Sequence, residues 1–150
     1  MFNENVNAQG KLEIVLRDKD GNVKSVLNVP NLVVTVGKGY IASRIASNAA
    51  TVMSHMEVGT DATTPDATNT GLGFAVASSR TALNISGGTV TNTQIVYTAV
   101  FGAGVGSGAL TEAGIFNASS LGSMLCRTTF PVVNKDVSDS LTISWKLTIS

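Results

Sequence analysis

The C-terminal stretch of the chain constrains the fold more than any other feature of the sequence. In Leu141-Thr-Ile-Ser-Trp-Lys-Leu-Thr-Ile, apolar residues occupy every second position from Leu141 to Ile149. Successive side chains of a β-strand point to opposite faces of the sheet, so this period of two predicts one buried face and one face in water. An antiparallel sheet is the usual setting for such a strand.

Other short runs have the same character, and turn residues separate them. Residues 11–17 and 23–29 flank Asp18-Lys-Asp-Gly-Asn, whose Asp-Gly pair suits a tight turn, so this segment predicts a hairpin. Further strands are expected over residues 53–59, 81–85, 89–101 and 123–130. Pro131 and the polar residues after it should turn the chain into the last strand.

One short helix is expected near residues 37–48. Thr35 is a suitable N-cap, and apolar residues recur at helical spacing from Ile41 onward. Ala42 and Ala46 are small enough to let this helix lie close to a sheet. The sequence therefore predicts a mainly β protein, an antiparallel β-sandwich (jelly-roll-like) with one short α-helix.

Length and the N-terminal composition indicate how the chain is organised. At 150 residues it is long enough for one domain with a substantial core. Residues 1–10 are polar and rich in Asn, with Phe2 as the one large apolar anchor, and are expected to form an arm. Residues 11–150 are expected to form the single sandwich domain.

The charge composition limits the partners. Formal net charge is zero and 13% of residues are charged, so no broad basic field is available for nucleic acid or an anionic membrane. No apolar run approaches the ~20 residues of a membrane span, and the start lacks the pattern of a signal peptide. We expect a soluble protein whose weakly charged surface is covered by copies of itself or by a partner.

Residues that could carry chemistry are few. Cys126 is the single cysteine, which excludes an internal disulfide and a Cys-based zinc cluster and fits a reducing cytoplasm. His55 is the single histidine, and no Gly-x-Ser-x-Gly nucleophile motif accompanies it. Glu112 stands alone before an apolar run and is expected to be a buried carboxylate that accepts backbone hydrogen bonds.

Three glycine-containing segments resemble ligand loops, and each fails on its spacing. The Asp18–Gly21 segment lacks the glutamate of a calcium loop, since position 27 is Leu. The Gly37-Lys-Gly segment lacks the first glycine of a phosphate loop. The glycines from Gly102 onward are not followed by a helix, as a dinucleotide site requires. No catalytic, metal-binding or cofactor-binding residue is therefore predicted.

Partner contacts are expected in loops and in the arm. The Thr/Pro/Asp/Asn-rich loop of residues 60–70 is long for a compact domain, and such loops often carry the interactions of rigid scaffolds. The glycine-rich loop could let a partner's backbone approach closely. The candidate contact residues are Phe2, Thr63, Thr64, Pro65, Asp66, Gly104, Val105 and Gly106.

An ordered set of motifs over about residues 31–149 resembles virion structural proteins of tailed bacteriophages. The motifs are Asn31-Leu-Val-Val-Thr, His55-Met-Glu-Val-Gly-Thr, Tyr97-Thr-Ala-Val-Phe, Glu112-Ala-Gly-Ile-Phe-Asn, Met124-Leu-Cys-Arg-Thr-Thr-Phe-Pro and Leu141-Thr-Ile-Ser-Trp. Such proteins look like β-sandwich or jelly-roll modules that decorate or cement the capsid, or serve as small tail and fibre components. The resemblance implies a virion role without catalysis, and does not choose between head and tail.

Three functions are therefore weighed. The first is a head decoration or cement protein that binds the major capsid protein on the outer capsid surface, after assembly in the host cytoplasm. The second is a tail, collar or fibre-attachment protein, whose partner would be a tail protein. The third is a small enzyme or a carbohydrate-binding module, for which Tyr40, Tyr97 and Trp145 are the aromatic residues available.

Overall fold

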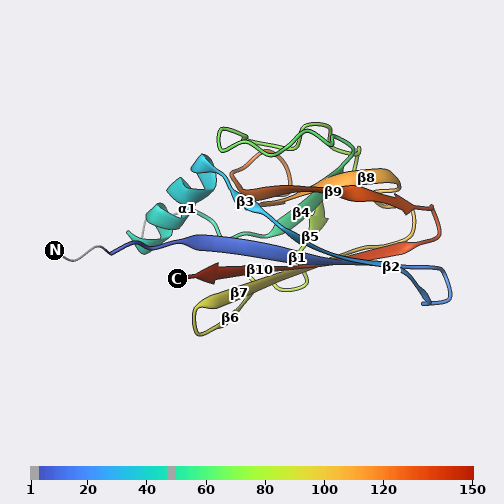
Figure 1. Cartoon of the computed structure of the whole chain (residues 1–150), viewed down its shortest axis with the longest axis horizontal. Helices are drawn as coiled ribbons and strands as arrows, with labels where there is room; N and C mark the ends of the chain where they lie inside the picture. The colour runs from blue at the N-terminus through green and yellow to red at the C-terminus, as the bar shows by residue number, and fades with distance from the viewer. Residues whose placement is uncertain (1–3, 47–49) are drawn as a thin grey trace.

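The computed structural model describes residues 4–46 and 50–150. The chain folds as an antiparallel β-sandwich of two five-stranded sheets (Figure 1). The first sheet has the strand order β2-β1-β10-β7-β6. Its strands are β2 (Val23–Pro30), β1 (Ala8–Arg17), β10 (Ser140–Ile149), β7 (Gln94–Phe101) and β6 (Thr89–Thr91). The second sheet has the order β3-β9-β8-β4-β5. Its strands are β3 (Leu32–Val33), β9 (Met124–Lys135), β8 (Gly108–Phe116), β4 (His55–Gly59) and β5 (Thr81–Ala82).

The core lies between the two sheets, where the predicted alternation of β10 is confirmed. Leu141, Ile143, Trp145 and Leu147 are buried, and Ile149 packs against the same core. Neighbouring strands continue these rows, because Trp145 stands opposite Leu12 of β1 and opposite Tyr97 of β7. Cross-strand rows of large apolar side chains are what stabilise one face of a sheet.

The predicted N-terminal hairpin is also confirmed. Strands β1 and β2 pair in antiparallel register around a turn in which the Asp18 carboxylate accepts hydrogen bonds from the backbone N–H groups of Asp20 and Asn22, both at 2.9 Å. Gly21 has φ +86°, which explains the need for glycine there. The turn interpretation of this Asp-Gly segment therefore holds.

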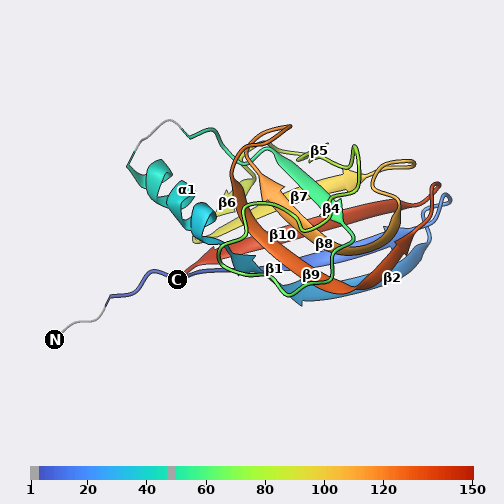
Figure 2. The ribbon, with the colours of Figure 1, turned by 90° about the horizontal axis from the view of Figure 1, so that it is seen from above.

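The arm is shorter than expected. Strand β1 begins at Ala8, and Asn7 still exchanges backbone hydrogen bonds with Ser150, so residues 8–10 belong to the sheet. Phe2 lies outside the described residues. The described arm residues 4–6 point away from the sandwich (Figures 1 and 2).

The helix differs from the prediction in its bounds and in how it packs. Helix α1 (Thr35–Ile45) has Val34 as N-cap with no side-chain cap, so Thr35 is the first helical residue and not the cap. Residues 47–48 of the predicted span lie outside the described residues. Ala42 and Ala46 are exposed; the close approach occurs at Gly37, where an added Cβ would lie 2.0 Å from the carbonyl oxygen of Leu125.

Two strand predictions were wrong in their extent. The expected long strand 89–101 is split into β6 and β7 by a turn at Asn92, which has φ 53°. The neighbouring 81–85 segment forms only the short β5, which pairs with β4 in the other sheet. The Ser86-Gly-Gly segment is therefore a crossing between sheets and not a hairpin turn.

The expectation that the turn into the last strand begins at Pro131 was wrong. Strand β9 continues to Lys135, and residues 130–132 lie opposite Thr111 alone, because Leu110 pairs with Val133 and Glu112 with Thr129. This is a bulge, and β3 pairs with β9 only at Cys126 and Arg127, so no ladder hydrogen bond from Pro131 is required.

The two ends of the sandwich carry different features. Helix α1, the arm and the end of β10 gather at one end (Figure 2). The turns that follow β1, β7 and β9 gather at the other, where the Lys24 ammonium lies 2.7 Å from the Asp139 carboxylate and 3.3 Å from that of Asp136. These contacts join the first hairpin to the last turn.

Candidate functional site

A long loop of residues 60–80 crosses the outer face of the second sheet (Figures 1 and 2). Glu112, on β8 and fully buried, holds it there. Its carboxylate accepts hydrogen bonds from the backbone N–H groups of Asp61 at 3.2 Å, Gly73 at 2.9 Å and Phe74 at 2.7 Å. The prediction that Glu112 is a buried acceptor of backbone hydrogen bonds is confirmed.

Arg127 of β9 completes this arrangement. Its Nε donates to Glu112 Oε2 at 2.9 Å, and its Nη2 lies 2.8 Å from the same oxygen. Its Nη1 donates to the carbonyl oxygen of Thr63 at 3.2 Å and to the side-chain oxygen of Asn69 at 3.0 Å. The guanidinium thus ties the carboxylate to the far part of the loop, and charge-assisted hydrogen bonds of this kind are the strong ones.

Sequence reasoning missed the role of Arg127. The signal was available, because an arginine inside the apolar run Met-Leu-Cys-Arg requires a buried acid, and Glu112 is the acid set beside an apolar run. Its side chain is 3% exposed and that of Glu112 is 0% exposed. The pair is therefore a structural ion pair of the scaffold.

The tip of the loop carries the first group of predicted contact residues. Thr63, Thr64 and Asp66 are exposed and Pro65 is half-buried. Hydrogen bonds from the hydroxyl and backbone N–H of Thr68 lower the pKa of the Asp66 carboxyl, as those of Thr63 do for Asp61. The loop is thus cross-linked by its own short polar side chains, and it presents threonines to solvent.

The second predicted group lies elsewhere, at the end of the sandwich away from α1. Gly104 is exposed, Val105 packs against the core, and Gly106 is buried. Gly106 has φ +60°, and a Cβ there would meet the Val58 side chain at 2.7 Å. The structure therefore does not bring Gly104–Gly106 together with Thr63–Asp66.

Neighbouring elements fix this glycine-rich loop in place. The Gly104 N–H donates to the carbonyl oxygen of Val137 at 2.7 Å, and the buried Lys135 ammonium donates to that of Gly102 at 2.9 Å. Burial lowers the pKa of Lys135. Whether these glycines touch a partner stays a prediction.

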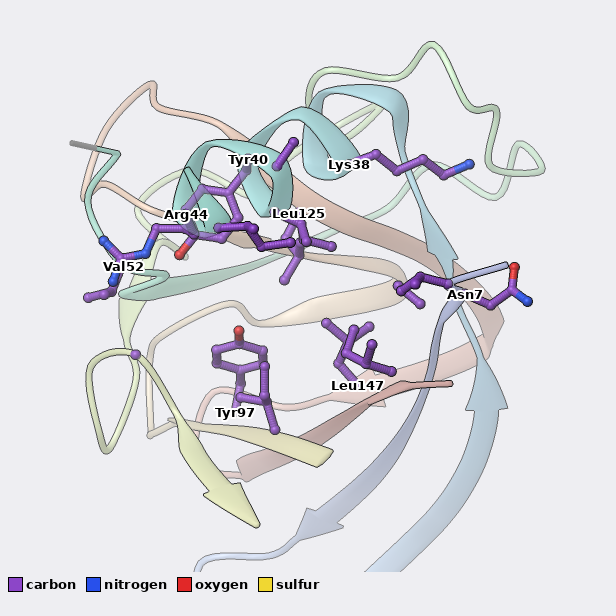
Figure 3. Close-up of a pocket in the computed structure, with 16 residues that line it drawn as sticks. Asn7, Lys38, Tyr40, Arg44, Val52, Tyr97, Leu125 and Leu147 are labelled. Carbon is purple, nitrogen blue, oxygen red and sulfur yellow. The ribbon is translucent and has the colours of Figure 1, made fainter. Parts of the chain in front are cut away.

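A groove opens beside α1, between the helix and the adjacent end of the sandwich (Figure 3). Its volume is about 860 Å³. Tyr97 and Leu147 of the first sheet form its floor, and Tyr40 of α1 lies across from them, with Leu125 of the second sheet beside the helix. Ile41 of α1 also lines the groove. The sequence reasoning did not find this groove, because it arises from where the helix sits.

His55 and Cys126, the residues considered for catalysis or metal binding, lie in surroundings typical of residues that only support the fold. The imidazole Nδ1 of His55 lies 2.8 Å from the hydroxyl of Ser54, and burial, helped by the charge of Arg80, lowers the His55 pKa. Cys126 is buried, and burial raises the pKa of its thiol. Within residues 4–46 and 50–150, no three His, Cys, Asp or Glu side chains come together in a group that could hold a metal ion.

In the part of the chain that the structure describes, no helix has the length and apolar character needed to cross a membrane. Comparison of the chain with known protein families, with curated proteins and with solved structures gave no significant match. Arguments about function therefore depend on the sequence motifs, the fold, the loop of residues 60–80 that Glu112 and Arg127 hold in place, and the groove.

Proposed function

We propose that this chain is a virion structural protein of a tailed bacteriophage, and that it acts as a head decoration or cement protein on the outer capsid surface. It would bury its loop surface across neighbouring major capsid subunits and so raise the free energy needed to separate them. The ordered motifs from Asn31 to Trp145 that resemble such virion proteins motivate the proposal.

The observation that carries it is the rigid support of the 60–80 loop. A buried ion pair and three backbone hydrogen bonds to Glu112 hold a loop whose exposed tip is rich in threonine. A loop ordered before binding loses little conformational entropy on docking, which favours attachment to a large fixed surface. The low content of charged residues fits a protein whose surface is largely covered by neighbouring subunits in an assembly.

The deciding measurement is the copy number of this chain in purified phage particles, by quantitative mass spectrometry against the major capsid protein. Hundreds of copies per particle that remain on tailless heads would support decoration. A few copies that leave with the tail would overturn decoration in favour of a tail or collar role. Absence from the particle would overturn the virion role itself.

A matched pair of variants tests the surface. Thr64→Lys changes the exposed tip of the braced loop, and Thr91→Lys makes the same change on exposed β6, in the other sheet. Added to heads stripped of the protein, the Thr64 variant should rebind more weakly than wild type and the Thr91 variant equally well. Equal rebinding by both would show that the loop is not the attachment surface.

A further inference from the structure

The groove beside α1 is an apolar site with a basic rim. Among the residues described as lining it, the charged ones are Lys38 and Arg44, and no carboxylate is present. Figure 3 shows these two side chains extending toward opposite ends of the opening. Among the described residues, Lys38 and Arg44 form no ion pair, and Arg44 donates to the carbonyl oxygen of Ala50 at 2.9 Å. An occupant with apolar side chains and a negative charge would complement this groove.

The N-terminal segment of the chain has this chemistry. Residues 1–6 read Met-Phe-Asn-Glu-Asn-Val, with Phe2, Glu4 and Val6 at alternate positions. In an extended segment these three side chains point to the same side, so two apolar groups flank one carboxylate. Val6 is 82% exposed, so its apolar surface is available for burial against a second copy.

The direction of the arm favours docking on a second copy. The arm's backbone hydrogen bonds to the sheet end at Asn7, and the described residues before it point away from the sandwich (Figures 1 and 2). Val6, Asn7 and Ala8 also line the rim of the groove. Each arm therefore leaves its own domain beside its own groove.

We propose that the α1 groove binds residues 1–6 of a second copy of this chain, so that two copies exchange arms around a twofold axis. Because arm and groove lie side by side on each copy, one rotation places both arms in both grooves, which is the self-complementary contact of a closed dimer. Phe2 would insert among the apolar floor residues, and Glu4 would face Lys38 or Arg44.

This inference is independent of the capsid proposal and is tested on the purified chain alone. Sedimentation velocity over a wide concentration range should show a dimer for the full chain. Deletion of residues 1–6 should give a monomer that still unfolds in one cooperative transition, with an apparent stability that no longer depends on protein concentration. Phe2→Ala should raise the dimer Kd by about 30-fold or more, the loss expected from truncating a buried aromatic anchor.

A complementation experiment identifies the groove as the receptor. Ala42 lines the groove and is exposed, so Ala42→Trp should block the groove without disturbing the core. The blocked chain and the arm-deleted chain should each be monomeric, yet a mixture should form a one-to-one heterodimer, because one supplies the arm and the other the groove. Val137→Trp, at the opposite end and 70% exposed, is the control and should leave the dimer intact.

Three outcomes would overturn the proposal. They are a full chain that stays monomeric at all concentrations, a dimer that survives deletion of the arm, and a mixture of the two monomeric variants that does not associate. Should Ala42→Trp fail to fold, Ile45→Asp changes the same groove at a position that is 80% exposed. A monomer that carries a bound acyl chain in native mass spectrometry would instead assign the groove to a lipid.

Discussion

The buried ion pair between Glu112 and Arg127 allows a quantitative prediction about the loop. Glu112→Gln keeps the shape of the side chain and one oxygen acceptor, but removes the charge that faces a guanidinium with 3% side-chain exposure. Removing one partner of a buried pair costs about 3–5 kcal/mol, because the other charge is left uncompensated. The Asp61 carboxylate, 3.5 Å from Nη2 and 30% exposed, compensates in part, so we expect a loss near the lower limit, about 3 kcal/mol.

Urea unfolding followed by Trp145 fluorescence measures this loss, since Trp145 is fully buried and the only tryptophan. The slope with urea should stay unchanged while the midpoint falls. Limited proteolysis should cut within residues 60–80 before the sandwich unfolds, because Glu112 receives the backbone hydrogen bonds of that loop.

The control is Glu13→Gln, which removes a carboxylate from the exposed face of β1. Surface substitutions of this kind change the free energy of unfolding by less than about 0.5 kcal/mol. If Glu112→Gln costs less than about 1 kcal/mol, the loop is held by neutral hydrogen bonds that glutamine also accepts, and the ion pair contributes little.

Three further predictions concern packing, pH and reactivity. Gly37→Ala should destabilise the protein by about 1–3 kcal/mol, because a Cβ there meets a backbone carbonyl of β9. Gly39→Ala on the same helix should stabilise it by about 0.5–1 kcal/mol, because an added Cβ has nothing within 4 Å. Thermal unfolding of the two variants measures both changes. The Lys24 ammonium lowers the pKa of Asp139 below its ordinary 3.8. The wild type should therefore be more stable than Asp139→Asn at neutral pH, and this difference should vanish as the pH falls through the lowered pKa. A difference in stability that persists in acid would contradict this. Burial raises the pKa of the Cys126 thiol, so a thiol reagent should label it only in denaturant, and rapid labelling of the native protein would refute its place in the core.

Local patterns predicted the parts of the fold that local forces decide. The alternation from Leu141 to Ile149 and the Asp18–Gly21 turn appear in the structure as expected, because side-chain period and turn chemistry act over a few residues. Residues 89–101 were mistaken for one strand, because β propensity is similar on both sides of Asn92. The backbone of Asn92 has a positive φ, but there is no glycine at this position to indicate a turn.

The candidate sites depended more on tertiary contacts. The sequence indicated Glu112 as a buried acceptor but not which N–H groups it serves, since Asp61, Gly73 and Phe74 reach it only after the loop crosses the sheet. The groove was not predictable, because the contact of Gly37 with Leu125 decides how α1 lies on the sheets. Helical spacing alone had indicated the alanines as the contact.

The pairing of β1 with β10 has a consequence for how the chain folds. Leu12 lies opposite Trp145, so the centre of the first sheet joins segments from the two ends of the sequence. On the ribosome, the β1–β2 hairpin emerges before β10, so the inward side chains of β1 stay uncovered until β10 has been made. Sheets built on such distant contacts fold in milliseconds to seconds. We expect the nascent hairpin to be the part of this molecule that most needs a chaperone during synthesis.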